Sequence, residues 1–282
     1  MAQFYDKIVP TAWIVAYRRK FSDIPFSNEI FNHLNSLREE RFGNITDEVL
    51  NPKLSPQYEA RQKIIDKYIL LSNTNQVLEL ASGFTSRGLY MSANSKVVYV
   101  EFDLPKVMED KIIIANSIIE SEGLKCSNLY FESGNALNYN DLIKSLKHFK
   151  QEPITIINEG LLRYLNFEEK TTVAKNIHKI LTNYGGQWIT SDITLKKLLE
   201  VENDVSRQNE QTSYKTGIDI DKNRFEDESH AKSFFQDLGF SIERHSFAEV
   251  KQNLVSHRIL DLSDEEVNNL IDFAVIYVMR PK

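Results

Sequence analysis

The sequence predicts an α/β fold in which a doubly wound, mostly parallel sheet of seven strands is covered by helices on both faces. Short β-type runs alternate with longer helical patterns from residue 77 onward, and such alternation is typical of a parallel sheet. One run, Ile-Thr-Ile-Ile at 154–157, is almost continuously apolar, as expected for a strand buried on both faces. We expect strands near 77–81, 97–101, 128–132, 154–158, 187–191, 241–245 and 272–278.

Two stretches between these strands have clear helical patterns, at 103–123 and 166–186. In the second, Asn166 is a residue type that caps helix starts, and Gly185-Gly186 is a typical stop. The two late runs near 241 and 272 are separated by a long acidic loop, and we expect them to add an antiparallel ending to the sheet.

Two regions fall outside the alternation. Residues 1–72 contain the periodic segments FNHLNSLREERF and YEARQKIIDKYILL, which predict an N-terminal helical extension packed on the main domain at 73–282. Residues 194–231 form a polar insertion that is too long for an ordinary connection, so we expect either a lid with some helix or a mobile loop.

Composition limits the class of protein. The 282 residues are 41% hydrophobic, enough for a well-buried core, and the net charge of -6 argues against nucleic acid as an obligate partner. The short basic run Arg18-Arg19-Lys20 is interpreted as a solvated helix face. The single Cys126 excludes an intrachain disulfide, and the six scattered histidines support no metal site. Without an apolar span or a secretory signal, we expect a cytoplasmic protein that does not enter membranes; its oligomeric state is left open.

The stretch QVLELASGFTSRGLY, residues 76–90, places small residues where the first strand turns toward a helix. Gly83 there would let a ligand approach the backbone closely. The second strand ends with Glu101 and Asp103, at a distance along the chain where an acid accepts hydrogen bonds from ribose hydroxyls. Together these features predict a nucleoside-containing ligand. The dinucleotide fingerprint and the phosphate-loop pattern are both broken, which argues against NAD, ATP and GTP.

At this point the residues resemble a known family. VLELASGFTSRG, YVEFDLPKVMEDK and NEGLLRYL, in this order and spacing, resemble the class I S-adenosylmethionine-dependent methyltransferases, and within them the leucine carboxyl methyltransferase family, which includes polyketide O-methyltransferases. The resemblance covers roughly residues 55–192. It implies a Rossmann-like fold, S-adenosyl-L-methionine as cofactor, and methyl transfer as the reaction.

The resemblance also implies roles for single residues. Arg61 would pair with the methionyl carboxylate of the cofactor, Gly83 would lie against its amino-acid part, and Asp103, with Glu101 beside it, would hold the ribose. Glu159 would lie near the cofactor's ammonium and the transferred methyl. The full cofactor-binding set is Arg61, Glu79, Ala81, Gly83, Arg87, Glu101, Asp103, Asn135, Ala136, Leu137 and Glu159.

Three positions depart from the family pattern. Ala81 stands where the family usually has glycine, and it fits the turn if its φ stays negative. Thr85 replaces an aspartate, which removes one polar support of the loop. Asn135 replaces an acid near the adenine, while Ala136 and Leu137 could still pack on the ring. Arg87 either supports the glycine turn, as its family counterpart does, or is solvated.

The acceptor is open to more than one interpretation. A carboxylate is ionised at neutral pH and needs no general base, and the sequence offers no obvious base, so we expect O-methylation of a carboxyl group on a small molecule or a peptide or protein C-terminus. Arg163 would anchor that carboxylate, with Arg18, Arg19 and Lys20 as second candidates. Glu159, Arg163 and Tyr164 form the candidate catalytic set, although Tyr164 could equally pack the turn. A hydroxyl-directed enzyme, a non-catalytic S-adenosylmethionine-binding module and an NAD-dependent oxidoreductase are the alternatives.

Overall fold

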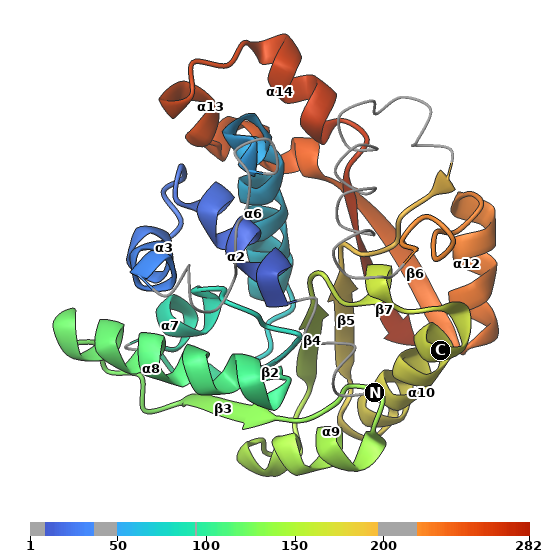
Figure 1. The fold of residues 1–282 in the computed structure, drawn as a ribbon. Helices are drawn as coiled ribbons and strands as arrows, with labels where there is room; N and C mark the ends of the chain where they lie inside the picture. Colours follow the sequence, from blue (N-terminus) through green and yellow to red (C-terminus); the bar gives the residue numbers. More distant parts are fainter. Residues whose placement is uncertain (1–8, 37–49, 94, 197–218) are drawn as a thin grey trace.

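The fold is a seven-stranded sheet with helices on both faces (Figure 1). A computed structural model describes residues 9–36, 50–93, 95–196 and 219–282. The strands lie in the order β3-β2-β1-β4-β5-β7-β6. Their bounds are β1 (Gln76–Leu80), β2 (Val98–Asp103), β3 (Leu129–Ser133), β4 (Ile154–Asn158), β5 (Gly186–Thr190), β6 (Phe240–Ser246) and β7 (Val275–Pro281).

Strand directions confirm the predicted mostly parallel sheet with an antiparallel ending. Neighbours from β3 through β5 are parallel, whereas β7 runs antiparallel to both β5 and β6 between which it lies. The chain leaves β1 toward β2 and β3 on one side and later returns to place β4 on the other side of β1. This reversal of strand order is where open α/β sheets bind ligands, at the carboxyl ends of the strands.

Helices follow the strands as the periodicity predicts. The predicted helix at 166–186 is α10 (Phe167–Tyr184), which begins with a capping box between Asn166 and Glu169 and ends at Gly185 with φ 79°. The predicted helix at 103–123 is α8 (Pro105–Ser121). The other helical elements are α2 (Val9–Arg19), α3 (Ser27–Ser36), η1 (Pro52–Leu54), α6 (Ser55–Leu71), α7 (Arg87–Ser92), α9 (Tyr139–Ser145), η2 (Leu146–His148), η3 (Leu162–Tyr164), α12 (Glu228–Asp237), η5 (Phe247–Asn253), α13 (Ser256–Ile259) and α14 (Asp264–Ile271).

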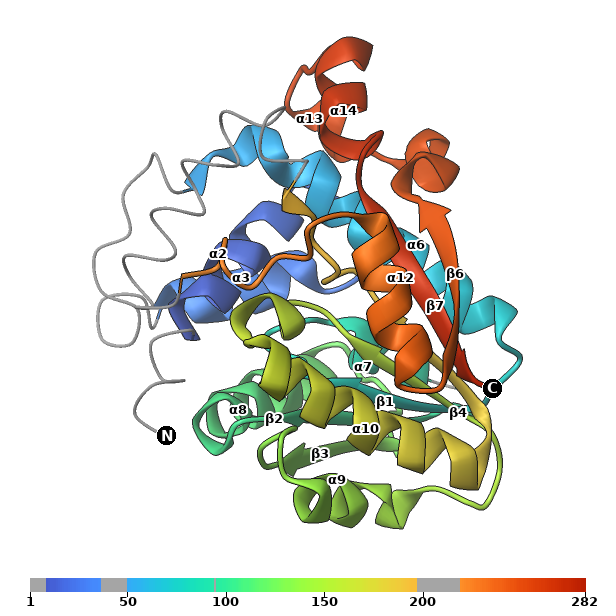
Figure 2. The ribbon, with the colours of Figure 1, turned by 90° about the vertical axis from the view of Figure 1, so that its right-hand side faces the viewer.

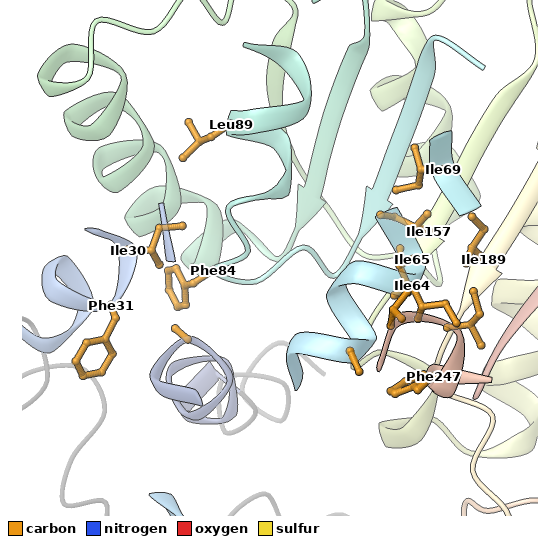
Figure 3. Close-up of a cluster of buried hydrophobic side chains, with 14 of the residues drawn as sticks. Ile30, Phe31, Ile64, Ile65, Ile69, Phe84, Leu89, Ile157, Ile189 and Phe247 are labelled. Carbon is orange, nitrogen blue, oxygen red and sulfur yellow. The ribbon is translucent and has the colours of Figure 1, made fainter. Parts of the chain in front are cut away.

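The two faces of the sheet carry separate hydrophobic clusters, because side chains alternate along each strand. Val77 joins the cluster under α2, α3, α6, α8 and α14, while its neighbour Leu78 joins the cluster under α9, α10 and α12. Figure 2 shows α2, α3 and α14 above β1 and β4, and α9 below them. In the first cluster, Ile64 and Ile65 of α6 lie beside Ile157 and Ile189 of the sheet (Figure 3).

The N-terminal helices therefore share their core with the sheet. The predicted segment FNHLNSLREERF is helical through Ser36, and its remainder lies outside the described residues. Most of the predicted insertion, 197–218, also lies outside them. Its final residues include the start of a helix: α12 begins at Glu228, and Asp227 caps it. Among the helices that are described, none has the length and apolar character to cross a membrane.

Candidate functional site

A cavity of about 380 Å³ opens at the carboxyl ends of β1, β2 and β4, where the strand order reverses. Ala81 and Gly83 of the turn after β1 line it, with φ values of 52° and 49°. The condition of a negative φ, under which alanine would fit the turn without strain, is not met at Ala81. The chain turns sharply there, and a left-handed alanine costs about 1–2 kcal/mol that the surrounding contacts must offset.

Lys111 of α8 provides such contacts. Its Nζ donates to the carbonyl of Gly83 at 3.0 Å and to that of Thr85 at 2.6 Å, and pairs with Glu101 Oε2 at 2.8 Å. Lys111 is 1% exposed and Glu101 is fully buried. Burial raises the pKa of Glu101, against the opposing effect of Lys111. The buried ammonium of Lys111 thus holds the turn, and its charge is balanced by Glu101 of β2.

Asp103 and Glu101 have different places, although both belong to β2. Asp103 ends the strand and lines the cavity, where its Oδ2 accepts the backbone N–H of Gly83 at 2.7 Å and its Oδ1 that of Leu104 at 2.7 Å. Glu101 lies two residues deeper, under α7 and α8, and does not line the cavity. The expected ribose contact of Glu101 is therefore not available to it, whereas Asp103 keeps an accessible position.

Glu159 follows β4 and forms ion pairs with three guanidinium groups. Its Oε1 contacts Nη2 of Arg19 and, at 2.8 Å, Nη2 of Arg61, while its Oε2 lies 3.2 Å from Nη2 of Arg87. Burial alone would raise the pKa of Glu159, but these three positive charges lower it well below its usual range. Glu159 is an anion at every relevant pH. The buried Nε atoms of Arg19 and Arg61 have no hydrogen-bond partner among the described residues.

Arg87, one of the three arginines that contact Glu159, is fully buried, so the solvated alternative for this residue is wrong. Its guanidinium pairs with Glu79 and, at 2.6 Å, with Asp66, and the Tyr99 hydroxyl donates to the other oxygen of Glu79 at 2.7 Å. Both oxygens of Glu79 are therefore engaged. Because Glu79 and Glu101 are register partners on one face of the sheet, each needs its own cation.

The loop after β3 borders the cavity with Asn135, Ala136 and Leu137. Asn135 Oδ1 accepts the N–H of Leu137 at 3.0 Å, and the N–H of Asn135 donates to Asp141 at 3.2 Å. The Asn135 side chain thus shapes its own loop, and Ala136 and Leu137 offer apolar surface. Gly134 is required just before it, because a Cβ there would lie 2.7 Å from Asp141 Cβ.

Asp192, after β5, holds the turn that carries Arg163 and Tyr164. Its carboxylate accepts from Asn158 Nδ2 at 2.6 Å and from three successive backbone N–H groups, those of 160, 161 and 162, at 2.8, 2.7 and 3.0 Å. The Tyr164 hydroxyl donates to Thr11 at 3.2 Å, and the Arg163 guanidinium lies 5.6 Å from the Tyr164 ring centre. Both side chains line the cavity.

The N-terminal helices supply the opposite wall. Arg18 and Arg19 are 2% and 5% exposed, so the solvated face expected for them is wrong, because α2 packs over the cavity. Two guanidinium groups contact the Tyr58 ring, with Arg18 Cζ 4.7 Å and Arg61 Cζ 4.6 Å from its centre. Arg18 Nη1 donates to the Tyr58 hydroxyl at 2.5 Å.

The cavity brings together most of the predicted residues: Arg61, Glu79, Ala81, Gly83, Asp103, Asn135, Ala136, Leu137, Glu159, Arg163 and Tyr164. Arg87 and Glu101 support it from behind. The sequence reasoning missed Tyr58, Lys111 and Asp192. Lys111 carried a signal, because it falls on the apolar stripe of its helix with Val107, Ile114 and Ile118. Asp192 carried a weaker one, an acid at the carboxyl end of a strand.

Comparison with solved structures shows the same fold in proteins that include methyltransferases. A DUF574 family protein from Streptomyces avermitilis is 12% identical, with a TM-score of 0.59 and coverage of 96% of this chain and 97% of that one. The magnesium protoporphyrin IX methyltransferase of Synechocystis, solved with bound SAH, is 11% identical, with a TM-score of 0.53 and coverage of 89% and 94%. A SAM-dependent methyltransferase from Anabaena variabilis is 10% identical, with a TM-score of 0.53 and coverage of 93% and 97%.

At such identities the likeness shows the fold alone. No curated protein matches the sequence. The family model of leucine carboxyl methyltransferase matches residues 24–178, more than half of the chain, and spans the glycine turn, Asp103 and Glu159. The chain belongs to the leucine carboxyl methyltransferase family and is an S-adenosylmethionine-dependent methyltransferase.

Proposed function

We propose that this enzyme methylates a carboxyl group, on a small molecule or a peptide or protein C-terminus. The observation that carries the proposal is the charge of the cavity. Among the described lining residues are six arginines (Arg18, Arg19, Arg61, Arg163, Arg224 and Arg244) and four acids (Glu79, Asp103, Glu159 and Asp192), an excess of two positive charges in a chain whose net charge is -6. A cavity with this balance attracts an anion.

The cofactor fits the residues at the other end of this cavity. The unpartnered Nε atoms of Arg19 and Arg61 suit the methionyl carboxylate, since a guanidinium binds a carboxylate through two N–H groups. Glu159 would attract the ammonium, and Asp103 would accept from the ribose hydroxyls. Ser82 in the turn has a buried hydroxyl without a partner among the described residues, which a polar cofactor group would satisfy. Leu137 and Ala136 would pack against the adenine.

Bound S-adenosylmethionine supplies an activated methyl on a positively charged sulfur. The protein's own contribution would be alignment of the acceptor and removal of water, since orientation is worth up to about 7–11 kcal/mol. The lining acids are already committed: Glu159 to three arginines, Asp192 to four donors, Asp103 to two backbone N–H groups and Glu79 to Arg87 and Tyr99. Burial raises the pKa of Glu79 to about 7, but both of its oxygens are engaged by Arg87 and Tyr99. Acids that already accept from the protein favour an acceptor that needs no general base.

The cofactor half of the proposal is tested by calorimetry. We expect Arg61→Ala and Asp103→Ala each to weaken S-adenosylmethionine binding about tenfold or more, because each removes a charge-assisted hydrogen bond worth roughly 1.5–3 kcal/mol. Arg258→Ala is the matched control, since Arg258 is exposed and does not line the cavity. Unchanged affinity in both cavity variants would place the cofactor elsewhere.

The acceptor half is tested by product formation. Wild-type enzyme with labelled S-adenosylmethionine is given a panel of carboxylic acids, C-terminal peptides and phenols. A labelled product that alkaline hydrolysis cleaves to labelled methanol is a methyl ester and supports the proposal. Alkali-stable ethers only would indicate the hydroxyl-directed alternative, and cofactor binding with no product from any acceptor would support a non-catalytic module.

A further inference from the structure

Tyr58 lies at the centre of the positive charge in the cavity. Arg18 reaches it from α2, Arg61 from the next turn of α6, and Arg163 from η3. The first two guanidinium groups lie 4.7 and 4.6 Å from the ring centre, a distance typical of cation–π contacts. Two guanidinium groups contact the ring and one of them also bonds the hydroxyl, so the side chain has little rotational freedom and its hydroxyl has a fixed position in the cavity.

The hydrogen bonds of Tyr58 are incomplete in a specific way. Arg18 Nη1 donates to the phenol oxygen at 2.5 Å, which takes up one acceptor position and points the O–H elsewhere. No residue that the structure describes accepts a hydrogen bond from this O–H, and Tyr58 lines the cavity. The other two tyrosines of the lining have other partners: the Tyr164 hydroxyl donates to Thr11, and Tyr277 of β7 is hydrogen-bonded to Arg244.

We propose that the Tyr58 hydroxyl contacts the methyl acceptor, donating its hydrogen to the carboxylate oxygen that is not methylated. This inference rests on the proposed carboxyl methylation. The reacting oxygen forms the new C–O bond, the C–S bond of the sulfonium breaks with its electron pair going to sulfur, and Tyr58 keeps its proton throughout. Arg18 and Arg61 hold the phenol, and the phenol fixes which acceptor oxygen faces the methyl.

The same environment gives the proposal a pH signature. Burial opposes ionisation of Tyr58, yet Arg18, Arg61 and Arg163 together lower its pKa below the ordinary tyrosine value. A donor must be protonated, so carboxylate binding should weaken as the pH rises through this lowered pKa. A general base for a hydroxyl acceptor would show the opposite sign, since it works only when ionised.

The test uses the full chain saturated with S-adenosylhomocysteine and titrated with benzoate and the straight-chain carboxylates from acetate to octanoate. We expect the tightest of these to bind wild type at least about tenfold more strongly than Tyr58→Phe, since a hydrogen bond to a charged group is lost. Tyr58→Phe keeps the ring and its contacts with the two guanidinium groups, so S-adenosylhomocysteine affinity should change less than twofold. Tyr184→Phe, outside the cavity, is the control.

Carboxylate affinity of wild type should fall at a pH below the ordinary tyrosine value, and that of Tyr58→Phe should stay flat across the same range. Equal carboxylate affinity in the two proteins, or affinity that rises with pH only in wild type, would overturn the inference while leaving the proposed function in place. Binding of S-adenosylhomocysteine with no carboxylate binding to wild type would overturn both. Failure to bind S-adenosylhomocysteine would refute the cofactor assignment itself.

Discussion

Lys111→Met tests how the fold supports the glycine turn. The change leaves the fully buried Glu101 carboxylate without its cation and removes the hydrogen bonds to the carbonyls of Gly83 and Thr85. Breaking a buried ion pair by removing one partner costs about 3–5 kcal/mol. In a domain of this size 1 kcal/mol lowers the melting temperature by roughly 2–4 °C, so we expect a drop of about 6–20 °C.

The loss should be specific to the unpaired charge. In the double variant Lys111→Met/Glu101→Leu both partners become apolar, and most of the stability should return, because no buried charge is left. S-adenosylmethionine binding should stay weakened in the double variant, since the turn carbonyls remain without their donor. Lys106→Met, at an exposed position of the same helix, is the control. Differential scanning calorimetry and calorimetric titration measure the two effects. A double variant no more stable than the single one would refute the reasoning.

Three further predictions concern other parts of the site. Burial lowers the pKa of Lys170 from its ordinary 10.5 to about 8. The contribution of Lys170 to the free energy of unfolding should therefore rise by up to about 3 kcal/mol between pH 8 and 10.5, because only the unfolded chain is protonated there. Urea unfolding measures this free energy against pH, and a wild-type curve parallel to that of Lys170→Met would contradict the prediction. Asp192→Asn should lower the free energy of unfolding by about 3 kcal/mol and also lower kcat/KM, because four donors lose their carboxylate. An unchanged free energy of unfolding and unchanged kinetics would show that the turn keeps its conformation without this carboxylate. Gly88→Ala should cost about 1–3 kcal/mol in thermal unfolding, because the new methyl would overlap Glu101 and lie 2.8 Å from Leu129 Cδ1; full stability would mean that the pocket has room.

Local sequence was enough to predict the sheet and the turn at which the cavity opens. Strand and helix periodicities are properties of neighbouring residues, so α10, with Asn166 and Gly185 at its ends, could be predicted from the printed letters. The turn at Gly83 and the acid Asp103 follow the same logic, because each lies at the end of a strand whose position the pattern gives. Helix ends were less well determined, since α8 begins at Pro105 and ends at Ser121 within the predicted 103–123.

Burial of charge could not be predicted in this way. Arg18 and Arg19 look like a solvated run in the sequence, and only the packing of α2 over the cavity turns them inward. Tyr58 has no distinctive neighbours along the chain, and its place among three arginines depends on α2, α6 and η3 meeting. The sequence by itself determined which elements form and where strands end, because those depend on local periodicity. The tertiary structure decided which charges share a cavity, because that depends on contacts between residues as far apart as Arg19 and Glu159.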